Sequence, residues 1–247
     1  MIGRLPALIG ATLAVVLLAA TASAQENETL TEQGKIEQII HDYLLAHPEV
    51  IIEAVSKYQA QQEQAAAAAQ ARALVDRREE LIHAPDAPVL GNPSGDVTIV
   101  EFFDYQCPYC KSTARSVLET VSADGNVRLV FKEFPILGPV SDYAAKAALA
   151  AQRQGKYPEL HMALMAFKGK LTEEDVMRLA TDLGLDAIRL AEDMEAPEIA
   201  ASLARNHELA GALGVRGTPA FVIGDQLVPG AITVDEMRQR IAAARQG

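Results

Sequence analysis

The chain has 247 residues, enough for one large domain or two small ones, and its 49% apolar and 22% charged residues are ordinary proportions for a globular protein. These values exclude a chain that is disordered throughout. Lys and Arg total 22 against 33 Asp and Glu, so the net charge is −11. An acidic chain has no general attraction to phosphate backbones, and we expect no nucleic-acid partner.

Residues 1–24 have the pattern of a secretory signal peptide. Arg4 supplies a short positive region, and the apolar run that follows at residues 8–20 is too short to be a good membrane span. Ala22-Ser23-Ala24 fits a cleavage site. An uncleaved anchor is the alternative. We expect cleavage after Ala24 and a periplasmic protein.

Residues 25–60 contain a helical segment with a narrow apolar face. Apolar residues recur at three- and four-residue spacing from Ile36 to Tyr58, with an interruption at His47-Pro48. This pattern predicts two short amphipathic helices or one kinked helix. So narrow a face cannot form a core alone, so it must pack on the rest of the chain or on other copies.

Residues 61–86 are rich in Ala, Gln, Glu and Arg, which are strong helix formers. Large apolar side chains are few, so we expect an exposed linker helix about 30 Å long. A partly melted linker is the alternative, because alanine-rich helices of this length are marginal in water. The two prolines of Ala84-Pro85-Asp86-Ala87-Pro88 predict a boundary after this linker.

Residues 87–247 alternate between strand and helix patterns. The predicted elements are a strand at 97–103, a helix at 107–122, a strand at 127–134, a helical block at 139–214, a hairpin at 220–228 with its turn at Asp225-Gln226, and a final helix opened by a capping box at 233–236. This order predicts an α/β domain with a helical insertion at about 139–214.

The two cysteines of the chain, Cys107 and Cys110, lie where a predicted strand passes into a helix. A disulfide across two intervening residues closes so small a loop that it stabilises little, so chemistry explains the pair better than stability. A helix start favours negative charge, and we expect Cys107 to be a thiolate that attacks disulfides. Cys110, one turn later and more buried, would resolve the mixed disulfide, and Pro108 fits the first helical turn.

Half of a metal site is the alternative reading of the two cysteines. Structural zinc usually has four ligands, and the five histidines include no pair at ligand spacing. We therefore assign no metal ligand. Zinc or copper(I) shared between chains remains open, since thiolates are soft ligands.

Residues 102–111, FFDYQCPYCK, resemble the active-site strand and helix of DsbA-like thioredoxin-fold oxidoreductases, and residues 217–221, GTPAF, resemble their cis-proline loop. The resemblance covers about residues 87–247. It implies a thioredoxin fold with an inserted helical domain, a cis Pro219, and a Thr218 that offers its backbone to an extended substrate. It implies a membrane redox partner and no organic cofactor.

The resemblance also implies roles around the cysteine pair. Glu101, six residues before Cys107, corresponds to an acid beneath the disulfide and would relay a proton to Cys110; an outward-facing strand residue is the alternative. Lys132 is its suggested counter-charge, and a surface lysine is equally consistent. Two aromatic residues complete the substrate-binding assignment as an apolar rim beside Pro108 for unfolded chains, namely Tyr105 and Tyr109.

Residues 36–50 resemble the N-terminal segment of ScsC-type proteins, periplasmic disulfide isomerases linked to copper tolerance, in which this segment builds a trimer. The resemblance implies a homo-oligomer, with a trimer expected. The predicted function is thiol–disulfide exchange with unfolded or wrongly bridged exported proteins, with an isomerase or reductase favoured over a DsbA-like dithiol oxidase. A copper or zinc chaperone and a holdase are the alternatives from other classes.

Overall fold

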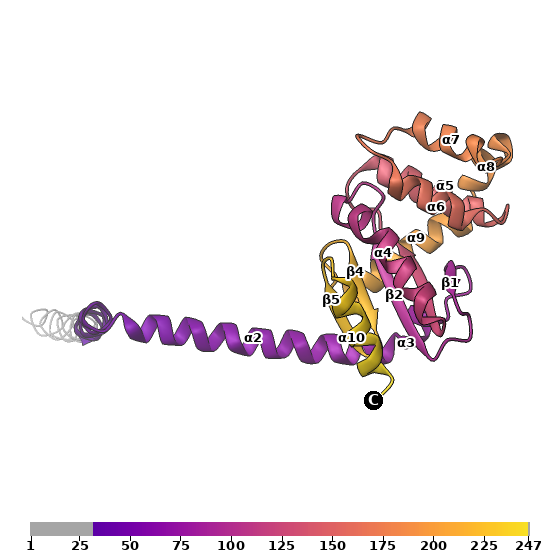
Figure 1. Ribbon diagram of the computed structural model, residues 1–247. Coiled ribbons are helices and arrows are strands. Elements are labelled where there is room, and N and C mark those ends of the chain that lie inside the picture. The colour runs from indigo at the N-terminus through magenta and orange to yellow at the C-terminus, as the bar shows by residue number, and fades with distance from the viewer. Residues whose placement is uncertain (1–31, 247) are drawn as a thin grey trace, which may run out of the picture. The chain divides into compact units, whose positions relative to one another are not determined.

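A computed structural model describes residues 32–246 (Figure 1). The predictions of a signal peptide and of its cleavage site lie outside the described residues. The chain divides between Ala65 and Ala66 into two compact units. None of the helices described is long and apolar enough to cross a membrane.

Residues 32–65, the described part of the N-terminal unit, are mostly helical. Residues 32–46 form one helix, the chain leaves helical geometry at His47 and Pro48 as predicted, and α2 (Glu49–Asp76) follows. Helix α2 continues through the alanine-rich stretch without a break. A row of large apolar side chains on these helices is 48–69% exposed: Ile36, Ile39, Ile40, Tyr43, Leu45, Ile51, Ile52, Val55 and Tyr58.

The last turns of α2 and the short helix α3 (Arg78–Ile82) belong to the second unit. Leu74 and Leu81 are buried in its core, and the Gln70 side chain donates a hydrogen bond to the Leu213 carbonyl at 3.0 Å. The expectation of an exposed linker is therefore wrong for this part. Large apolar side chains are few here, but these two are packed against the sheet.

The second unit is built on a five-stranded mixed sheet in the order β1-β3-β2-β4-β5. The strands are β1 (Val89–Gly91), β2 (Val97–Phe103), β3 (Val127–Glu133), β4 (Ala220–Ile223) and β5 (Gln226–Pro229). The central pair β2 and β3 is parallel, and the other pairs are antiparallel. Both central strands are buried along almost their whole length, because helices cover both of their faces.

Two details of the sheet differ from the sequence prediction. Strand β1 was missed, because it has three residues and ends at Gly91, whose φ of 74° is typical of a turn. The hairpin turn consists of Gly224 and Asp225, one residue earlier than predicted, since Ile223 pairs with Gln226. A two-residue hairpin turn favours a positive φ, and Gly224 supplies it at 64°.

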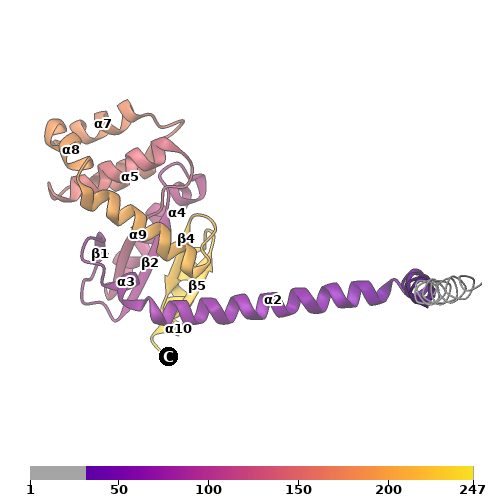
Figure 2. The ribbon, with the colours of Figure 1, turned by 180° about the vertical axis from the view of Figure 1, so that it is seen from behind.

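Helices cover both faces of the sheet (Figures 1 and 2). One face, which we call the front face, packs against α4 (Pro108–Asp124) and α10 (Val234–Ala244). The opposite back face packs against α9 (Pro197–Leu213), α3 and the end of α2. The inserted block is helical as predicted, and short turns divide it into α5 (Pro139–Gln152), α6 (Tyr157–Ala166), α7 (Glu173–Asp182), α8 (Ala187–Met194) and α9. The result is the predicted thioredoxin fold with a helical insertion.

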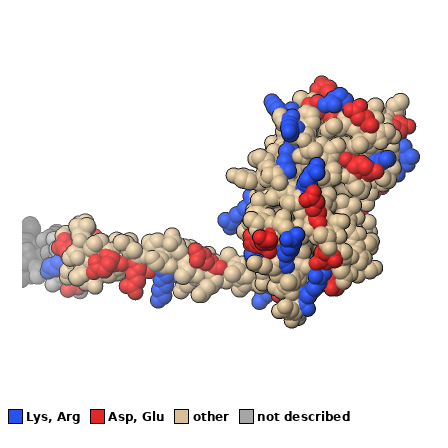
Figure 3. All heavy atoms as spheres, viewed as in Figure 1, with Lys and Arg blue, Asp and Glu red and all other residues tan. Residues whose placement is uncertain are grey.

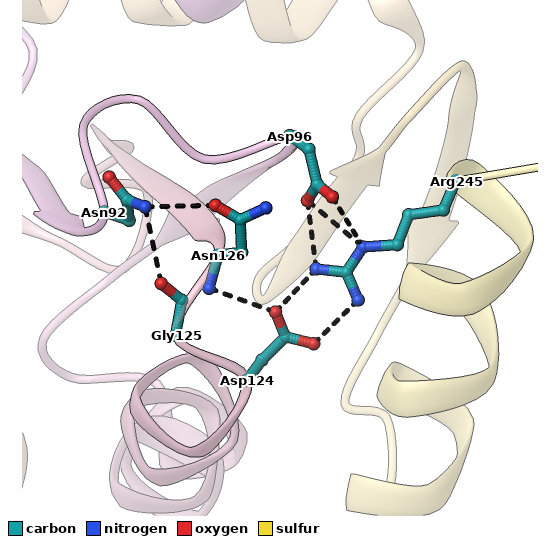
Figure 4. A network of polar contacts seen from close by, with 6 residues as sticks. All are labelled: Asn92, Asp96, Asp124, Gly125, Asn126 and Arg245. Atoms are coloured by element: carbon teal, nitrogen blue, oxygen red, sulfur yellow. Dashed lines mark hydrogen bonds and ion pairs between the residues drawn. The ribbon is translucent and has the colours of Figure 1, made fainter.

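An ion-pair network ties the end of α10 to the sheet (Figure 4). The Arg245 guanidinium lies 2.9 Å from Asp96, before β2, and 2.6 Å from Asp124, at the end of α4. Hydrogen bonds from Arg245 hold the pKa values of both carboxyls below their ordinary range. Elsewhere on the second unit, acidic and basic side chains are interspersed on the face seen in Figure 3.

Candidate active site

The two cysteines lie at the start of α4, directly after the turn that ends β2. Cys107 is the N-cap residue, with extended backbone angles, and its sulfur accepts a hydrogen bond from the Cys110 N–H at 3.5 Å. Pro108 occupies the first helical turn, as predicted. The first N–H groups of a helix have no partner within the helix, and that of Cys110 points at this sulfur.

The loop between α9 and β4 faces Cys107 from the other side. Its Thr218–Pro219 peptide bond is cis, as expected. The Cys107 thiol donates a hydrogen bond to the Thr218 carbonyl at 3.2 Å. The structure therefore brings together Cys107, Thr218 and Pro219, although 111 residues separate the first two.

Cys110 lies deeper than Cys107 and is fully buried. Burial is the main cause that raises the pKa of the Cys110 thiol well above its ordinary value, and a negative charge on Glu101 acts in the same direction. Both thiols are free in this structure. At neutral pH Cys110 therefore carries its proton and must lose it before it can attack a disulfide.

Glu101 is buried on the front face, so the outward-facing alternative does not apply. Burial raises the pKa of its carboxyl to about 8. Within the described part of the chain, no hydrogen bond reaches this carboxyl. A neutral carboxylic acid is therefore available near Cys110.

Lys132 is not the counter-charge of Glu101. In the parallel register Glu101 is opposite Phe131, while Lys132 is opposite Phe102. Successive side chains of a strand point to opposite faces, so Lys132 lies on the back face. Its ammonium donates to the Glu80 carbonyl at 2.7 Å, and burial lowers its pKa to about 8.

The two tyrosines of the predicted rim have different environments. Tyr109 is 65% exposed next to the exposed Pro108, which fits a substrate contact. Tyr105 is buried, with its hydroxyl bonded to Glu133 and its ring against Phe103. The assignment of Tyr105 to a substrate-binding rim is therefore wrong, because its ring turns into the core after β2 ends.

Asp104 fixes the turn before Cys107. One oxygen of its buried carboxylate accepts bonds from the Gln106 N–H at 2.7 Å and the Ser141 hydroxyl at 2.8 Å. The other accepts from the N–H groups of Ile136 and Leu137 at 2.8 and 2.9 Å. These two residues are 39% and 49% exposed, so Asp104 holds an apolar pair close to the active-site turn. No motif in the sequence marks Ile136 and Leu137, because they follow β3 and are far from the cysteines along the chain.

A second buried acid, Glu133, also escaped the sequence analysis. One of its oxygens accepts hydrogen bonds from the hydroxyls of Tyr105 at 2.8 Å and Tyr157 at 2.9 Å. The His161 Nδ1 lies 3.1 Å from the Tyr105 hydroxyl. Burial raises the pKa of Glu133 well above its ordinary value, partly opposed by the two hydroxyls, and burial lowers that of His161 to about 3. The spacing of apolar residues at positions 157–165 predicts a helix packed on the core. It does not predict that Tyr157 and His161 gather around Glu133 and Tyr105.

Across residues 32–246, no three or more His, Cys, Asp or Glu side chains gather as a metal site would require. The chemistry that the described site supports is thiol exchange. A reactive thiol at a helix start, a second thiol beneath it and a nearby neutral acid supply a nucleophile, a resolving group and a proton store.

Comparisons with known proteins agree with this site. The family model of the DSBA-like thioredoxin domain matches residues 98–242, and that of the copper resistance protein ScsC N-terminal domain matches residues 32–65. A thioredoxin-like oxidoreductase from Silicibacter pomeroyi is 52% identical, with a TM-score of 0.68 over 69% of this chain and 98% of the other. Proteus mirabilis ScsC in a transitional conformation is 27% identical, with a TM-score of 0.66 over 91% of this chain and 98% of the other.

Two curated relatives extend these comparisons. The chain is 31% identical over 161 residues to the Na(+)/H(+) antiporter NhaA 1 of Salinispora arenicola but spans about a quarter of its length. It is 26% identical to the probable disulfide bond formation protein D of Bacillus anthracis, over 62% of this chain and 76% of the relative. The fold and the comparisons place the chain in a family of thiol–disulfide oxidoreductases. More particularly, the chain belongs to the DsbA-like thioredoxin family and carries an ScsC-type N-terminal domain.

Proposed function

We propose that the protein acts in the periplasm as a disulfide isomerase or reductase on unfolded or wrongly bridged exported proteins. The observation that carries the exchange chemistry is the Cys107 sulfur at the start of α4, 3.2 Å from the Thr218 carbonyl. Similar proteins support the location, among them a periplasmic thioredoxin-like protein from Salmonella enterica that is 28% identical.

In the proposed reaction, the Cys107 thiolate attacks one sulfur of a substrate disulfide. A bond forms between Cys107 and that sulfur, the substrate disulfide breaks, and the released substrate thiolate takes up a proton. A different substrate thiolate then attacks the mixed disulfide and frees Cys107, which completes an isomerisation without net oxidation. Alternatively Cys110 attacks Cys107, releases a reduced substrate, and leaves an enzyme disulfide that a membrane redox partner would reduce.

Glu101 and Thr218 have supporting roles in this proposal. In its ionised form Glu101 accepts the Cys110 proton when Cys110 attacks, and the neutral acid returns that proton when Cys110 leaves as a thiolate. Thr218 pairs its backbone with an extended substrate segment, in the manner of an added strand. Beside Pro219, the exposed Pro108 and Tyr109 would contact apolar parts of an unfolded chain.

The isomerase assignment depends on the N-terminal extension. In this proposal, residues 1–24 are removed on export and residues 25–60 hold several copies of the chain together. Residues 61–86 link this segment to residues 87–247, which carry out the disulfide exchange. The exposed apolar row between Ile36 and Tyr58 and the match to the ScsC N-terminal domain support a homo-oligomer, with a trimer expected. Several active sites on one assembly suit an enzyme that must hold a substrate while bonds rearrange.

Refolding of scrambled, fully oxidised ribonuclease A tests the proposal. The chain from Gln25 is added in reduced form, beside a Cys107→Ser variant and a truncation that lacks residues 25–60. Recovery of ribonuclease activity that needs both Cys107 and the extension is the expected result. Fast oxidation of reduced ribonuclease without recovery from the scrambled form would replace the isomerase by a DsbA-like oxidase.

A matched variant separates assembly from chemistry. Ile39→Glu places a charge in the exposed apolar row, and Gln38→Glu places the same charge beside it on a polar position. We expect Ile39→Glu to give a single-chain mass by light scattering and to lose isomerisation, while Gln38→Glu keeps both. A wild-type mass of one chain would contradict the oligomer.

A further inference from the structure

Most basic side chains at the surface of the second unit have an acidic partner. From β1 to residue 246, ion pairs join an Asp or a Glu to Lys146, Arg153, Lys156, Arg178, Arg189, Arg205, Arg238, Arg240 and Arg245. Two further cations, Arg128 and Lys132, donate instead to the carbonyls of Ile82 and Glu80 on the back face. The basic residues of this stretch that form no ion pair with a described residue are Lys111, Arg115, Lys168, Lys170 and Arg216.

Lys111 ties the loop between α6 and α7 to the start of the cysteine helix. It directly follows Cys110 in α4, and its ammonium donates a hydrogen bond to the Phe167 carbonyl at 2.9 Å. The same ammonium lies 5.7 Å from the centre of the Phe167 ring. The residues that follow Phe167 along the chain are therefore held beside the first turns of α4.

Three exposed cations gather around this contact. Lys168 and Lys170 follow Phe167 in the loop before α7. Arg115 lies four residues after Lys111 in α4, and residues at this spacing share one face of a helix, with Cβ atoms about 6 Å apart. The side of the active site formed by α4 and this loop is therefore basic.

A further exposed cation lies on the other side of the catalytic sulfur. Arg216 is two residues before Thr218, whose carbonyl is 3.2 Å from the Cys107 sulfur. Exposed cations thus flank the position of a substrate disulfide from two sides. We call Arg115, Lys168, Lys170 and Arg216 the basic surface.

The acidic residues near the basic surface do not neutralise it. Glu119, one turn after Arg115, and Glu173, three residues after Lys170, are exposed, and among the described residues neither forms an ion pair with the basic surface. The Asp104 carboxylate is buried and occupied by four hydrogen bonds. Although the net charge of the chain is −11, exposed charges more than about 8–10 Å away are largely screened at physiological ionic strength. The cations therefore set the local potential beside Cys107.

We propose that the basic surface docks an acidic segment of the client polypeptide, next to the disulfide that Cys107 attacks. The inference rests on the proposed exchange function and adds a substrate class to it, namely clients with Asp or Glu close to their cysteines. Complementary charge acts mainly on the rate of association. The basic surface therefore speeds the arrival of an acidic client, while Thr218 pairs with the extended segment whatever its charge.

Two synthetic peptides that differ in charge test the inference. Each has one central cysteine, joined in a mixed disulfide to 2-thiopyridine, with Glu on both sides of the cysteine in one peptide and Gln in the other. The Cys107 thiolate attacks the peptide sulfur, a bond forms between these two sulfurs, and the thiopyridine sulfur leaves with the electron pair of the broken bond and takes up a proton. The absorbance of the released thiopyridone gives the second-order rate constant for the reduced chain from Gln25.

The ratio of the two rate constants is the quantity compared. We expect the wild type to react about tenfold faster with the Glu peptide than with the Gln peptide at low ionic strength, and the ratio to approach one in 1 M salt. Lys168→Glu/Lys170→Glu should lower the ratio at low ionic strength to one or below. Arg115→Glu should lower it by less, because it reverses one charge.

Arg238→Glu/Arg240→Glu is the matched control. It changes the net charge by the same amount on α10, where Arg240 donates to Gln226 at 3.2 Å. Gln226 begins β5 directly after the hairpin turn, at the opposite end of β4 from Pro219. This variant should keep the wild-type ratio, because its charges lie away from the active site.

A wild-type ratio of one at low ionic strength would overturn the inference. A raised ratio that persists in both Lys168→Glu/Lys170→Glu and Arg115→Glu would do so as well. If instead these variants abolish binding to phosphatidylglycerol vesicles while the wild-type peptide ratio is one, an anionic membrane replaces the acidic client.

The design separates folding and general reactivity from docking. Thermal unfolding shows whether each variant is folded, and Arg115→Glu keeps the test valid if the double variant is not. The Gln peptide, measured on the same preparation, cancels any general loss of Cys107 reactivity. A wild type that releases no thiopyridone from either peptide would refute the proposed exchange function, which is a different failure from a ratio of one.

Discussion

The two faces of the central strands bury ionisable groups in opposite ways. On the front face, Glu101 and Glu133 are buried beside the cysteine helix, and their neighbours are neutral hydroxyls and aromatic rings. On the back face, one residue along the same strand, Lys132 is buried against a backbone carbonyl of α3. The acids lie on the side of the cysteines, whereas the lysine lies against α3.

Neighbouring residues of one strand therefore face different surroundings. One points toward the cysteine helix, and the next points toward the helices that pack on the back face. The same alternation places Phe103 in the core of the front face and Phe102 in that of the back face. Substitutions on the front face should therefore change pH dependence and thiol exchange. Those on the back face should change stability and leave exchange intact.

Glu101→Gln should give the largest effect on stability. The folded pKa of about 8 lies above the ordinary 4.5, so the folded state keeps a proton that the unfolded chain releases. The free energy of unfolding of the wild type therefore falls as pH rises from 4.5 to 8. The Glu101→Gln variant has no carboxyl at this position and does not lose stability in this way. Urea unfolding should therefore show the variant to be more stable than the wild type by up to about 5 kcal/mol near pH 8, and by little below pH 4.5.

Glu119→Gln on the exposed side of α4 is the matched control and should show no such pH dependence. An equal stability difference at pH 4.5 and pH 8 for Glu101→Gln would remove the distinction between the faces.

Leu81→Ala should give the next largest effect. Leu81 is fully buried in the back-face core, and deletion of such a side chain costs about 2–5 kcal/mol of unfolding free energy. We expect this loss at every pH and an unchanged rate of exchange with a small disulfide in the folded variant. Val75→Ala, at an exposed position, should change stability by less than about 0.5 kcal/mol. Slower exchange in Leu81→Ala would show that the faces are coupled.

Lys132→Met tests the charge on the back face. Because the folded pKa is lowered from 10.5 to about 8, the unfolded state binds a proton that the folded state lacks between these values. The free energy of unfolding of the wild type therefore rises with pH across that window, the opposite of the Glu101 effect. We expect the variant to be about 1–3 kcal/mol more stable at pH 7, with the gap narrowing toward pH 10. A destabilised variant would mean that the bond to Glu80 outweighs the burial of charge.

Arg245→Ala should give the smallest effect, because its ion pairs with Asp96 and Asp124 are partly exposed. We expect the Tm to fall by about 2–4 °C, with a smaller decrease at high salt. Arg238→Ala, whose acidic neighbour is 3.7 Å away and exposed, should leave the Tm unchanged. A larger decrease in 1 M salt would contradict an electrostatic origin.

The sequence predicted the parts of the site that depend on local order along the chain. The strand, Cys107 at a helix start and the cis Pro219 follow from motifs whose residues are neighbours in sequence. The hydrogen bond from Tyr157 to Glu133 and the contact of His161 with Tyr105 could not be predicted in this way, because they depend on where α6 crosses the strand ends. The predictions for Tyr105 and Lys132 were wrong for the same reason. Each depended on the side of the sheet toward which the side chain points, and the motifs do not give this direction.

The fold was predicted in the same uneven manner. The seven-residue strand Val97–Phe103 is a long apolar run and was predicted with its bounds. Strand β1 is too short to show alternation, and Gly91 gave it the signature of a turn. The burial of Leu74 and Leu81 was not predicted. The prediction used the small number of large apolar residues in this segment, and that number does not show which residues they contact.

The margins of the sheet bear on aggregation. An enzyme that receives unfolded chains is exposed to segments that pair readily with free strands. Strand β1 offers three residues at one margin, and β5 offers four at the other, ending in Pro229, which lacks an N–H. Both margins are therefore poor templates for growth of a β-aggregate. In the proposed function, a client segment would pair with the Thr218 loop, from which it can be released, rather than with the sheet.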